Sequence, residues 1–194
     1  GEYVGADIVG AFLIEYFIKK YPEENTYSYD LRSTSYIKEL LESNNKRAIN
    51  TRVGHSYIKE TMRENKSFFS MELSGHFYFW FDENLVYDSA LRASIEILDA
   101  YSKKDESMSK LLEKYQKYVK SPETNFEVSN KQDVINKIKD FYSTLDQEEL
   151  DGITISEEEW WANIRASNTE NVLRLNLEAK NKDLYDKKLN ELSN

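Results

Sequence analysis

The chain has 194 residues, which suits one large domain or two small ones, and 40% of them are hydrophobic, including 14 Tyr and 9 Phe. It contains no cysteine, which excludes a disulfide framework and a thiolate zinc site. The net charge of −9 argues against nucleic-acid and membrane partners, because Lys and Arg supply most of the affinity for their phosphates. A small phosphorylated ligand stays possible, because a few arginines can make one site locally basic.

The most apolar stretch, residues 4–18, carries Asp7 and Glu15 and therefore reads as an amphipathic core helix. No stretch reaches the ~18 uninterrupted apolar residues that a membrane span needs. The N-terminal residues also lack the basic-then-apolar layout of a signal peptide. We therefore expect a cytoplasmic protein.

Strands alternate with helices in the first half of the chain. The pattern predicts helices at 7–20, 33–45, 56–65 and 88–104, and strands at 27–31, 47–53, 67–73 and 77–81. Apolar side chains line the last of these helices at Leu91, Ile95, Leu98 and Ala100. This alternation is typical of an α/β three-layer domain, which we place at residues 1–110.

The sequence changes character after residue 102. A charged stretch at 103–125 is predicted to be helical up to Pro122 and to connect two domains. Beyond it the pattern predicts strands at 125–129, 152–156, 159–167 and 172–179 and helices at 131–143 and 182–194. We interpret residues 111–194 as a smaller α+β domain with a mostly antiparallel sheet, and 103–120 as the hinge.

Two polar clusters follow predicted strands in the first domain. In "YDLRST", Arg32 stands at the end of a short strand, where an arginine can also be a surface or capping residue. In "TRVGHS", Gly54 allows a tight turn and His55 can exchange protons near neutral pH, although a turn histidine can also be structural.

A third cluster, "MELSGH", interrupts an aromatic strand at residues 71–76. Glu72 and Ser74 have the same parity in an extended strand, so both side chains can point to one side and grip vicinal sugar hydroxyls. Gly75 permits close approach of a ligand to the backbone, and His76 completes the cluster. The alternative is a polar hairpin turn.

The fourth cluster, "RASNTEN", spans residues 165–171. Arg165 supplies a charged fork, and Ser167, Asn168 and Thr169 supply hydroxyl, amide and backbone donors, a combination that suits a phosphate dianion. An Asx-rich turn between two strands is the alternative.

In this order the four clusters resemble the α-D-phosphohexomutase superfamily, most closely its phosphomannomutase/phosphoglucomutase branch. "MELSGH" is similar to the loop that selects the sugar in domain 3 of that family, and "RASNTEN" to the phosphate loop of domain 4. "YDLRST", "RVGHSYIKE" and "ELDGITI" resemble further family segments. Met71 and Asn171 depart from the glycine and the proline that are usual at these positions.

The resemblance implies reversible conversion of hexose 1-phosphate and hexose 6-phosphate through a phosphoserine and a bisphosphorylated sugar. It implies that Glu72 and Ser74 bind hydroxyls, that Arg165, Ser167, Asn168 and Thr169 bind the phosphate, and that Arg32 and His55 serve catalysis, with Gly54, Gly75 and His76 in the substrate site.

The phosphoserine and Mg²⁺ motifs of domains 1 and 2 are not in the sequence. We therefore expect a C-terminal half that partners those domains, binds no metal itself and is inactive alone. Two alternatives stay open, namely a standalone phosphosugar-binding module and a protein whose clusters are ordinary turns.

Overall fold

The chain folds into two compact units, residues 1–117 and 118–194. The structure is a computed structural model that describes residues 3–82, 85–120, 122–167 and 170–193. None of the described helices combines the length and the apolar character that a membrane span requires.

A mixed sheet forms the middle of the first unit. Its described strands are β1 (Thr26–Asp30), β2 (Arg47–Thr51), β3 (Phe69–Met71), β4 (Phe77–Asp82) and β5 (Leu85–Asp88), in the order β2-β1-β3-β4-β5. The first three strands run parallel, whereas β4 and β5 are antiparallel additions. Because Asp30 pairs with Thr51 and Tyr29 with Met71, the carboxyl ends of the three parallel strands lie next to one another.

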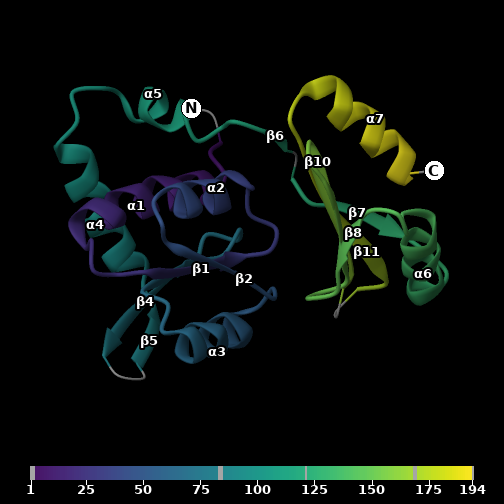
Figure 1. Ribbon diagram of the computed structural model, residues 1–194, viewed down its shortest axis with the longest axis horizontal. Coiled ribbons are helices and arrows are strands. Elements are labelled where there is room, and N and C mark those ends of the chain that lie inside the picture. The colour runs from purple at the N-terminus through teal and green to yellow at the C-terminus, as the bar shows by residue number, and fades with distance from the viewer. Residues whose placement is uncertain (1–2, 83–84, 121, 168–169, 194) are drawn as a thin grey trace. The chain divides into compact units, whose positions relative to one another are not determined.

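Helices cover both faces of this sheet. They are α1 (Ala6–Lys20), α2 (Tyr36–Ser43), α3 (His55–Asn65), α4 (Ala90–Ser102) and α5 (Met108–Glu113). The main core joins α1, α2, α4 and α5 to one face, where Phe17 contacts the rings of Phe68, Phe69 and Phe79. Ile58 and Met62 of α3 pack with Tyr78 on the other face, and Figure 1 shows α3 on the opposite side of the sheet from α1 and α2.

Helix α4 presents an unexpected side to the core. Leu91, Ile95 and Leu98, which line it in the sequence, are 74%, 57% and 66% exposed, whereas Glu96 is buried. Glu96 accepts a hydrogen bond from Lys20 of α1 at 2.7 Å, and the Arg92 guanidinium lies 4.5 Å from the Phe79 ring centroid. Ala93 and Ala100 are also buried and Ile97 packs against the core, so α4 faces the protein through small apolar residues, Ile97 and charged residues, and only its large side chains at Leu91, Ile95 and Leu98 face outward.

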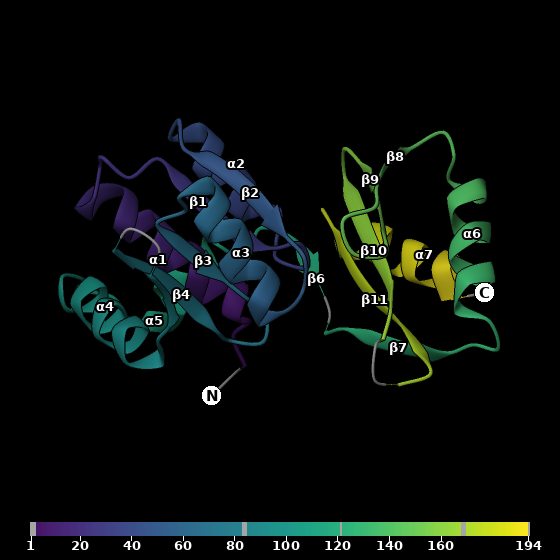
Figure 2. The same ribbon diagram turned by 90° about the horizontal axis from the view of Figure 1, so that it is seen from below.

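The second unit has helices on one face of an antiparallel sheet. Its described strands are β6 (Val119–Lys120), β7 (Thr124–Glu127), β8 (Asp146–Glu148), β9 (Ile153–Glu157), β10 (Trp160–Ala166) and β11 (Val172–Ala179). The order is β6-β11-β10-β9-β8, with β7 also paired to β11. Helices α6 (Lys131–Phe141) and α7 (Lys182–Ser193) contribute to one shared core and lie on the same side of the strands (Figure 2).

These two architectures confirm the predicted α/β three-layer domain and the smaller α+β domain with its antiparallel sheet. The prediction of a helix from residue 103 up to Pro122 is wrong, because helix α5 spans only Met108–Glu113 and the short strands β6 and β7 follow it. Leu112 and Tyr115 belong to the core of the first unit, so this stretch is not a free connector. Strands β5 and β8 were not predicted.

Candidate functional site

The first group of polar side chains lies at the carboxyl ends of β1, β2 and β3. Arg32 follows β1, His55 begins the helix after β2, and Glu72 directly follows β3. Ligands of open α/β sheets bind outside such strand ends, where loops leave in different directions. The sheet topology therefore brings together three of the four clusters that the sequence singled out.

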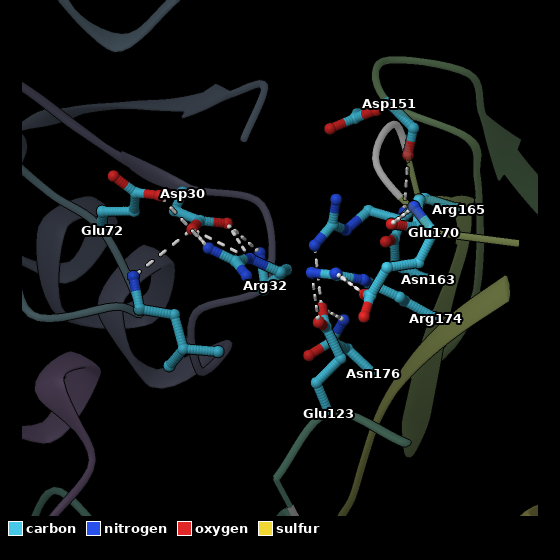
Figure 3. Close-up of polar contacts among 12 residues, drawn as sticks. Asp30, Arg32, Glu72, Glu123, Asp151, Asn163, Arg165, Glu170, Arg174 and Asn176 are labelled. Carbon is cyan, nitrogen blue, oxygen red and sulfur yellow. Dashed lines mark hydrogen bonds and ion pairs between the residues drawn. The ribbon is translucent and has the colours of Figure 1, made fainter. Parts of the chain in front are cut away.

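Asp30, the last residue of β1, fixes the position of Arg32. The Asp30 carboxylate is fully buried, and its two oxygens share the N–H of Arg32 Nε, each at 3.0 Å, while Nη2 donates a further short hydrogen bond. The carboxylate also accepts bonds from the backbone amides of Arg32 (2.8 Å) and Leu73 (3.3 Å). Figure 3 shows the guanidinium held against this carboxylate. Asp30 thus links the loop after β1 to the loop after β3.

Glu72 is the buried member of the turn between β3 and β4. Its Oε2 accepts a hydrogen bond from the Tyr78 hydroxyl at 3.0 Å, and its Oε1 lies 3.5 Å from Arg32 Nη2. Burial and then the charge of Glu72 raise the pKa of the Tyr78 phenol, which stays protonated as a donor. The carboxylate therefore keeps lone pairs that a ligand hydroxyl can use.

The prediction that Glu72 and Ser74 share one side of an extended strand is wrong. Strand β3 ends at Met71, and a turn closed by the Gly75 amide on the Glu72 carbonyl (2.9 Å) follows. Gly75 has a φ of +95°, a conformation that glycine adopts without strain. As a result, Glu72 is buried while Ser74, Gly75 and His76 are exposed.

The two histidines of the chain meet over one carboxylate. His76 Nδ1 lies 2.6 Å and His55 Nε2 lies 3.4 Å from Oδ2 of Asp88, at the end of β5. The two imidazole rings are edge to face at 5.9 Å, and His55 also packs against the Tyr78 ring at 5.0 Å. Gly54, with a φ of +128°, forms the turn that places His55 there.

The second group lies on the face of the β10–β11 hairpin that the helices do not cover. Because Ala162 and Ile164 of β10 belong to the core shared with α6 and α7, Asn163 and Arg165 point to the opposite face. The antiparallel register sets Arg165 opposite Arg174 and Asn163 opposite Asn176. The two arginines therefore form one cross-strand pair, and the two asparagines form a second pair beside it.

Glu123, just before β7, joins these rows. Its Oε2 accepts hydrogen bonds from Arg165 Nη2 and Asn176 Nδ2, both at 3.0 Å, and its Oε1 accepts one from Arg174 Nη1 at 3.2 Å. Arg174 Nη2 also donates to Glu170 at 2.7 Å. Figure 3 shows the two guanidinium groups converging on the Glu123 carboxylate.

Several buried polar atoms of this face have no hydrogen-bond partner among the described residues. They are Nε of Arg165 and Arg174 and Oδ1 of Asn163 and Asn176. Buried polar groups are normally satisfied, so such a cluster marks a place for water or a polar ligand. The cavity of about 240 Å³ between the sheet and its helices has an apolar lining that includes Phe126 and Ile138, so it is a different feature.

The predicted phosphate loop follows Arg165 directly. Ser167 is buried, its amide donates to the Val172 carbonyl at 3.0 Å, and its Oγ accepts from the Glu170 amide at 3.2 Å. Lys131 Nζ binds the carbonyls of Ser167 and Glu170 at 3.1 and 3.2 Å. Asn168 and Thr169 lie outside the described residues.

Gly152 allows a second segment to approach Arg165. It has a φ of +72°, and a Cβ at this position would lie 2.2 Å from the Ile164 carbonyl oxygen and 2.7 Å from Arg165 Cα. Any other residue would collide with the backbone of β10. This contact also brings Asp151 near, whose carbonyl accepts a hydrogen bond from Asn163 Nδ2 at 3.0 Å.

Family models match both units in order. The model for the alpha/beta/alpha domain III of phosphoglucomutase/phosphomannomutase matches residues 6–118, and the model for the C-terminal domain of the same family matches residues 123–192. The chain belongs to the phosphoglucomutase/phosphomannomutase family. The predicted resemblance to domains 3 and 4 of phosphohexomutases is thereby confirmed.

Individual relatives agree with this membership. The phosphomannomutase of Methanocaldococcus jannaschii is 38% identical over 194 residues, which are 100% of this chain and 42% of that protein. A family protein from Burkholderia thailandensis matches with a TM-score of 0.82 at 21% identity, over 96% of this chain and 40% of that one. The N-acetylphosphoglucosamine mutase of Aspergillus fumigatus, in complex with GlcNAc-6P and magnesium, matches with a TM-score of 0.61 at 15% identity, over 97% of this chain and 42% of that one. The chain therefore spans well under half the length of these relatives.

The next feature is the kind of ligand that the described polar residues can hold. Within the described ranges no three His, Asp or Glu side chains gather in a way that could hold a metal ion. The polar groups of the two units include arginines, amides and hydroxyls, which suit oxyanions and sugar hydroxyls.

Proposed function

We propose that this chain is the sugar- and phosphate-binding C-terminal part of a phosphomannomutase/phosphoglucomutase. In the whole enzyme, hexose 1-phosphate and hexose 6-phosphate would interconvert through a phosphoserine and a bisphosphorylated sugar. The observation that carries the proposal is the ordered match to domain III and the C-terminal domain across almost the entire chain. The enzyme would be cytoplasmic, with Mg²⁺ bound by its other domains.

The substrate has to bind in two orientations that exchange its phosphate ends. In the proposal Glu72 and Ser74 bind the sugar hydroxyls that keep equivalent places in both orientations. The geometry supports this role for Glu72, because its buried carboxylate is fixed by Tyr78 and still has acceptor capacity. Gly75 and His76 would shape the same turn around the ligand.

Arg165, Ser167, Asn168 and Thr169 would bind the phosphate that does not react. The support is the position of Arg165 on the polar face of the hairpin, together with the unpartnered buried atoms beside it. A guanidinium held in a fixed orientation binds an oxyanion with charge-assisted hydrogen bonds and loses little side-chain freedom on binding.

Arg32 and His55 would act near the reacting hydroxyl. Arg32 is held by Asp30 in a buried position, which suits stabilisation of developing negative charge. His55, in the turn that Gly54 forms, shares the Asp88 carboxylate with His76, which orients both rings. Phosphoryl transfer depends mainly on such positioning and on charge stabilisation.

The proposal is tested by NMR titration of the 194-residue chain with glucose 1-phosphate. We expect shifts of the backbone amide signals at 72–76 and 165–171. Arg165→Ala should weaken binding about 10- to 100-fold, since one charge-assisted hydrogen bond contributes ~1.5–3 kcal/mol. Arg63→Ala, which removes an exposed arginine of α3, is the matched control and should change nothing.

Two outcomes would count against the proposal. Absence of any shift in either segment would leave the clusters as ordinary turns. Turnover of glucose 1-phosphate by the 194-residue chain alone would contradict the division of labour, because the phosphoryl donor is assigned to another part of the enzyme. If the 194-residue chain binds glucose 1-phosphate but the protein from the complete reading frame is inactive, a standalone phosphosugar-binding module would be favoured instead.

A further inference from the structure

A carboxylate lies at the centre of the group that the proposed function assigns to phosphate binding. Glu123 uses both oxygens to hold Arg165, Arg174 and Asn176, and its side chain is only 19% exposed. Glu170 engages Arg174 from the other side. Two guanidinium groups are thus balanced by two carboxylates before any ligand arrives.

The register of the hairpin explains why an acidic residue is needed there. Arg165 and Arg174 stand directly opposite each other on one face, and like charges in this arrangement repel. A bridging carboxylate turns that repulsion into two ion pairs, at 3.0 and 3.2 Å. Glu123 therefore compensates the charge of both arginines in the folded site and is more than a surface residue.

The same carboxylate opposes an incoming phosphate. It accepts a hydrogen bond from Arg165 Nη2 at 3.0 Å, so a phosphate anchored by other N–H groups of the same guanidinium would lie within a Debye length, about 8 Å, of Glu123. At physiological salt, repulsion over this distance lowers the affinity for a dianion about 10-fold and for a monoanion about 3-fold.

We propose that Glu123 is the built-in anion of the phosphate site and that its charge keeps phosphate affinity low. The proposal rests on the proposed function, in which Arg165 anchors the non-reacting phosphate. A site that has to release one phosphate end and take up the other gains nothing from tight uniform binding of both. Glu123 would thus favour exchange of the two orientations, at the cost of affinity.

The direction in which one substitution changes the phosphate affinity separates this role from a merely structural one. Glu123→Gln keeps a side chain of the same size whose carbonyl oxygen can still accept from a guanidinium, but it removes the charge. A structural role predicts weaker phosphate binding in this variant, because the arginines lose their partner. A charge-opposing role predicts tighter binding.

The experiment titrates inorganic phosphate into the 194-residue chain and follows the backbone amide signals of residues 165–171 by NMR. Glu123→Asp keeps the charge. Glu158→Gln makes the same change of charge in the turn before β10, at the opposite end of that strand from Arg165. Titrations at about pH 5 and about pH 8.5 compare mainly monoanionic with mainly dianionic phosphate. Glu123→Ala, also neutral, replaces Glu123→Gln if the latter does not give a dispersed spectrum.

We expect Glu123→Gln to bind phosphate about 10-fold more tightly than the unmodified chain at the higher pH and about 3-fold more tightly at the lower pH. Glu158→Gln should match the unmodified chain, and Glu123→Asp, which keeps the charge, should bind phosphate no more tightly than the unmodified chain. Equal or weaker binding by Glu123→Gln, or an equal gain in Glu158→Gln, would overturn the role of Glu123 and leave the proposed function standing. If no variant shows a shift up to about 100 mM phosphate, the affinity is far weaker than a millimolar dissociation constant. That result would overturn both the role of Glu123 and the proposed function.

Discussion

Single residues decide how the loop after β1 is held, and Asp30 is the clearest case. Its carboxylate is fully buried and binds the Arg32 guanidinium and two backbone amides. Asp30→Asn would leave a buried guanidinium without its main counter-charge, so we expect the free energy of unfolding to fall by about 3 kcal/mol. Urea unfolding monitored by circular dichroism measures it.

The control for this prediction is the double variant Asp30→Asn/Arg32→Met. Because it removes the stranded charge as well, we expect it to recover part of the lost stability. An Asp30→Asn protein as stable as the unmodified chain would show that Glu72, 3.5 Å from Arg32, suffices as a counter-charge.

The local motifs of the sequence contain the candidate loop residues but not the partners that these residues contact in the structure. His76 and Arg165 belong to local motifs, whereas their partners Asp88 and Glu123 reach them through strand pairing that no short stretch encodes. One signal was readable, because polar residues alternate at Asn163 and Arg165 in one strand and at Arg174 and Asn176 in the next. That alternation indicates a polar face opposite the core, but only the register shows which residues meet.

At the scale of elements, helix α4 shows how an apolar stripe can mislead. Leu91, Ile95 and Leu98 have the spacing of a buried face, yet they point outward, because the face with Ala93 and Ala100 packs in the core and Glu96 has a partner on α1. Periodicity identifies a helix face, and the contacts of its neighbours determine whether this face is the buried one.

A matched pair of substitutions tests this orientation. Leu98→Ala should change the free energy of unfolding by no more than about 0.5 kcal/mol, because the side chain is 66% exposed. Leu13→Ala in α1, where the leucine is fully buried, should lower it by about 2–5 kcal/mol. Equal losses in the two variants, measured by urea unfolding, would place Leu98 in the core.

Helix α1 is tied to the segment after α5 by a titratable group. Burial by itself would raise the pKa of Glu15, but hydrogen bonds from Lys114, Lys19 and Tyr115 outweigh burial and lower it from 4.5 to about 2. A lowered pKa in the folded state means that ionised Glu15 stabilises the fold above pH 4.5, and that this stability is lost as the pH falls towards 2.

Comparison of Glu15→Gln with the unmodified chain checks this pH dependence. We expect the variant to be less stable by about 1–2 kcal/mol at neutral pH, a value reduced by solvent screening of the half-exposed lysines. The difference should shrink below pH 4.5 and approach zero near pH 2. A difference that stays constant between about pH 7 and about pH 3 would contradict the assignment.

Short strands were not predicted, because only the pairing of their backbone with a neighbouring strand defines them. Strand β8 reads Asp-Gln-Glu and has no hydrophobic pattern, but its backbone pairs with β9. Strand β5 exposes half of its four residues and is recognised through its register with β4. Helix α5 ends at Glu113 with Leu112 buried, and the core then takes Tyr115 as well, which charge and helix propensity at 103–125 did not indicate.

For the whole molecule, the decisive feature is that each unit has a core of its own. The buried residues of the first core end at Tyr115, and those of the second begin at Tyr142, with partly buried neighbours from Val119 onward. A domain with its own core can in principle fold alone. We therefore expect residues 1–117 and residues 118–194, expressed separately, each to unfold cooperatively on heating.

The end point of the first unit can be tested in the same way. A chain of residues 1–110 stops where the sequence placed the boundary, but it lacks Leu112 and Tyr115, which are 4% and 2% exposed. Because removal of each large buried side chain costs about 2–5 kcal/mol, this chain should melt well below residues 1–117 or fail to fold. Leu112→Ala/Tyr115→Ala in residues 1–117 should reproduce much of that loss. If residues 1–110 melted at the same temperature as residues 1–117, the stretch after α4 would be a connector after all.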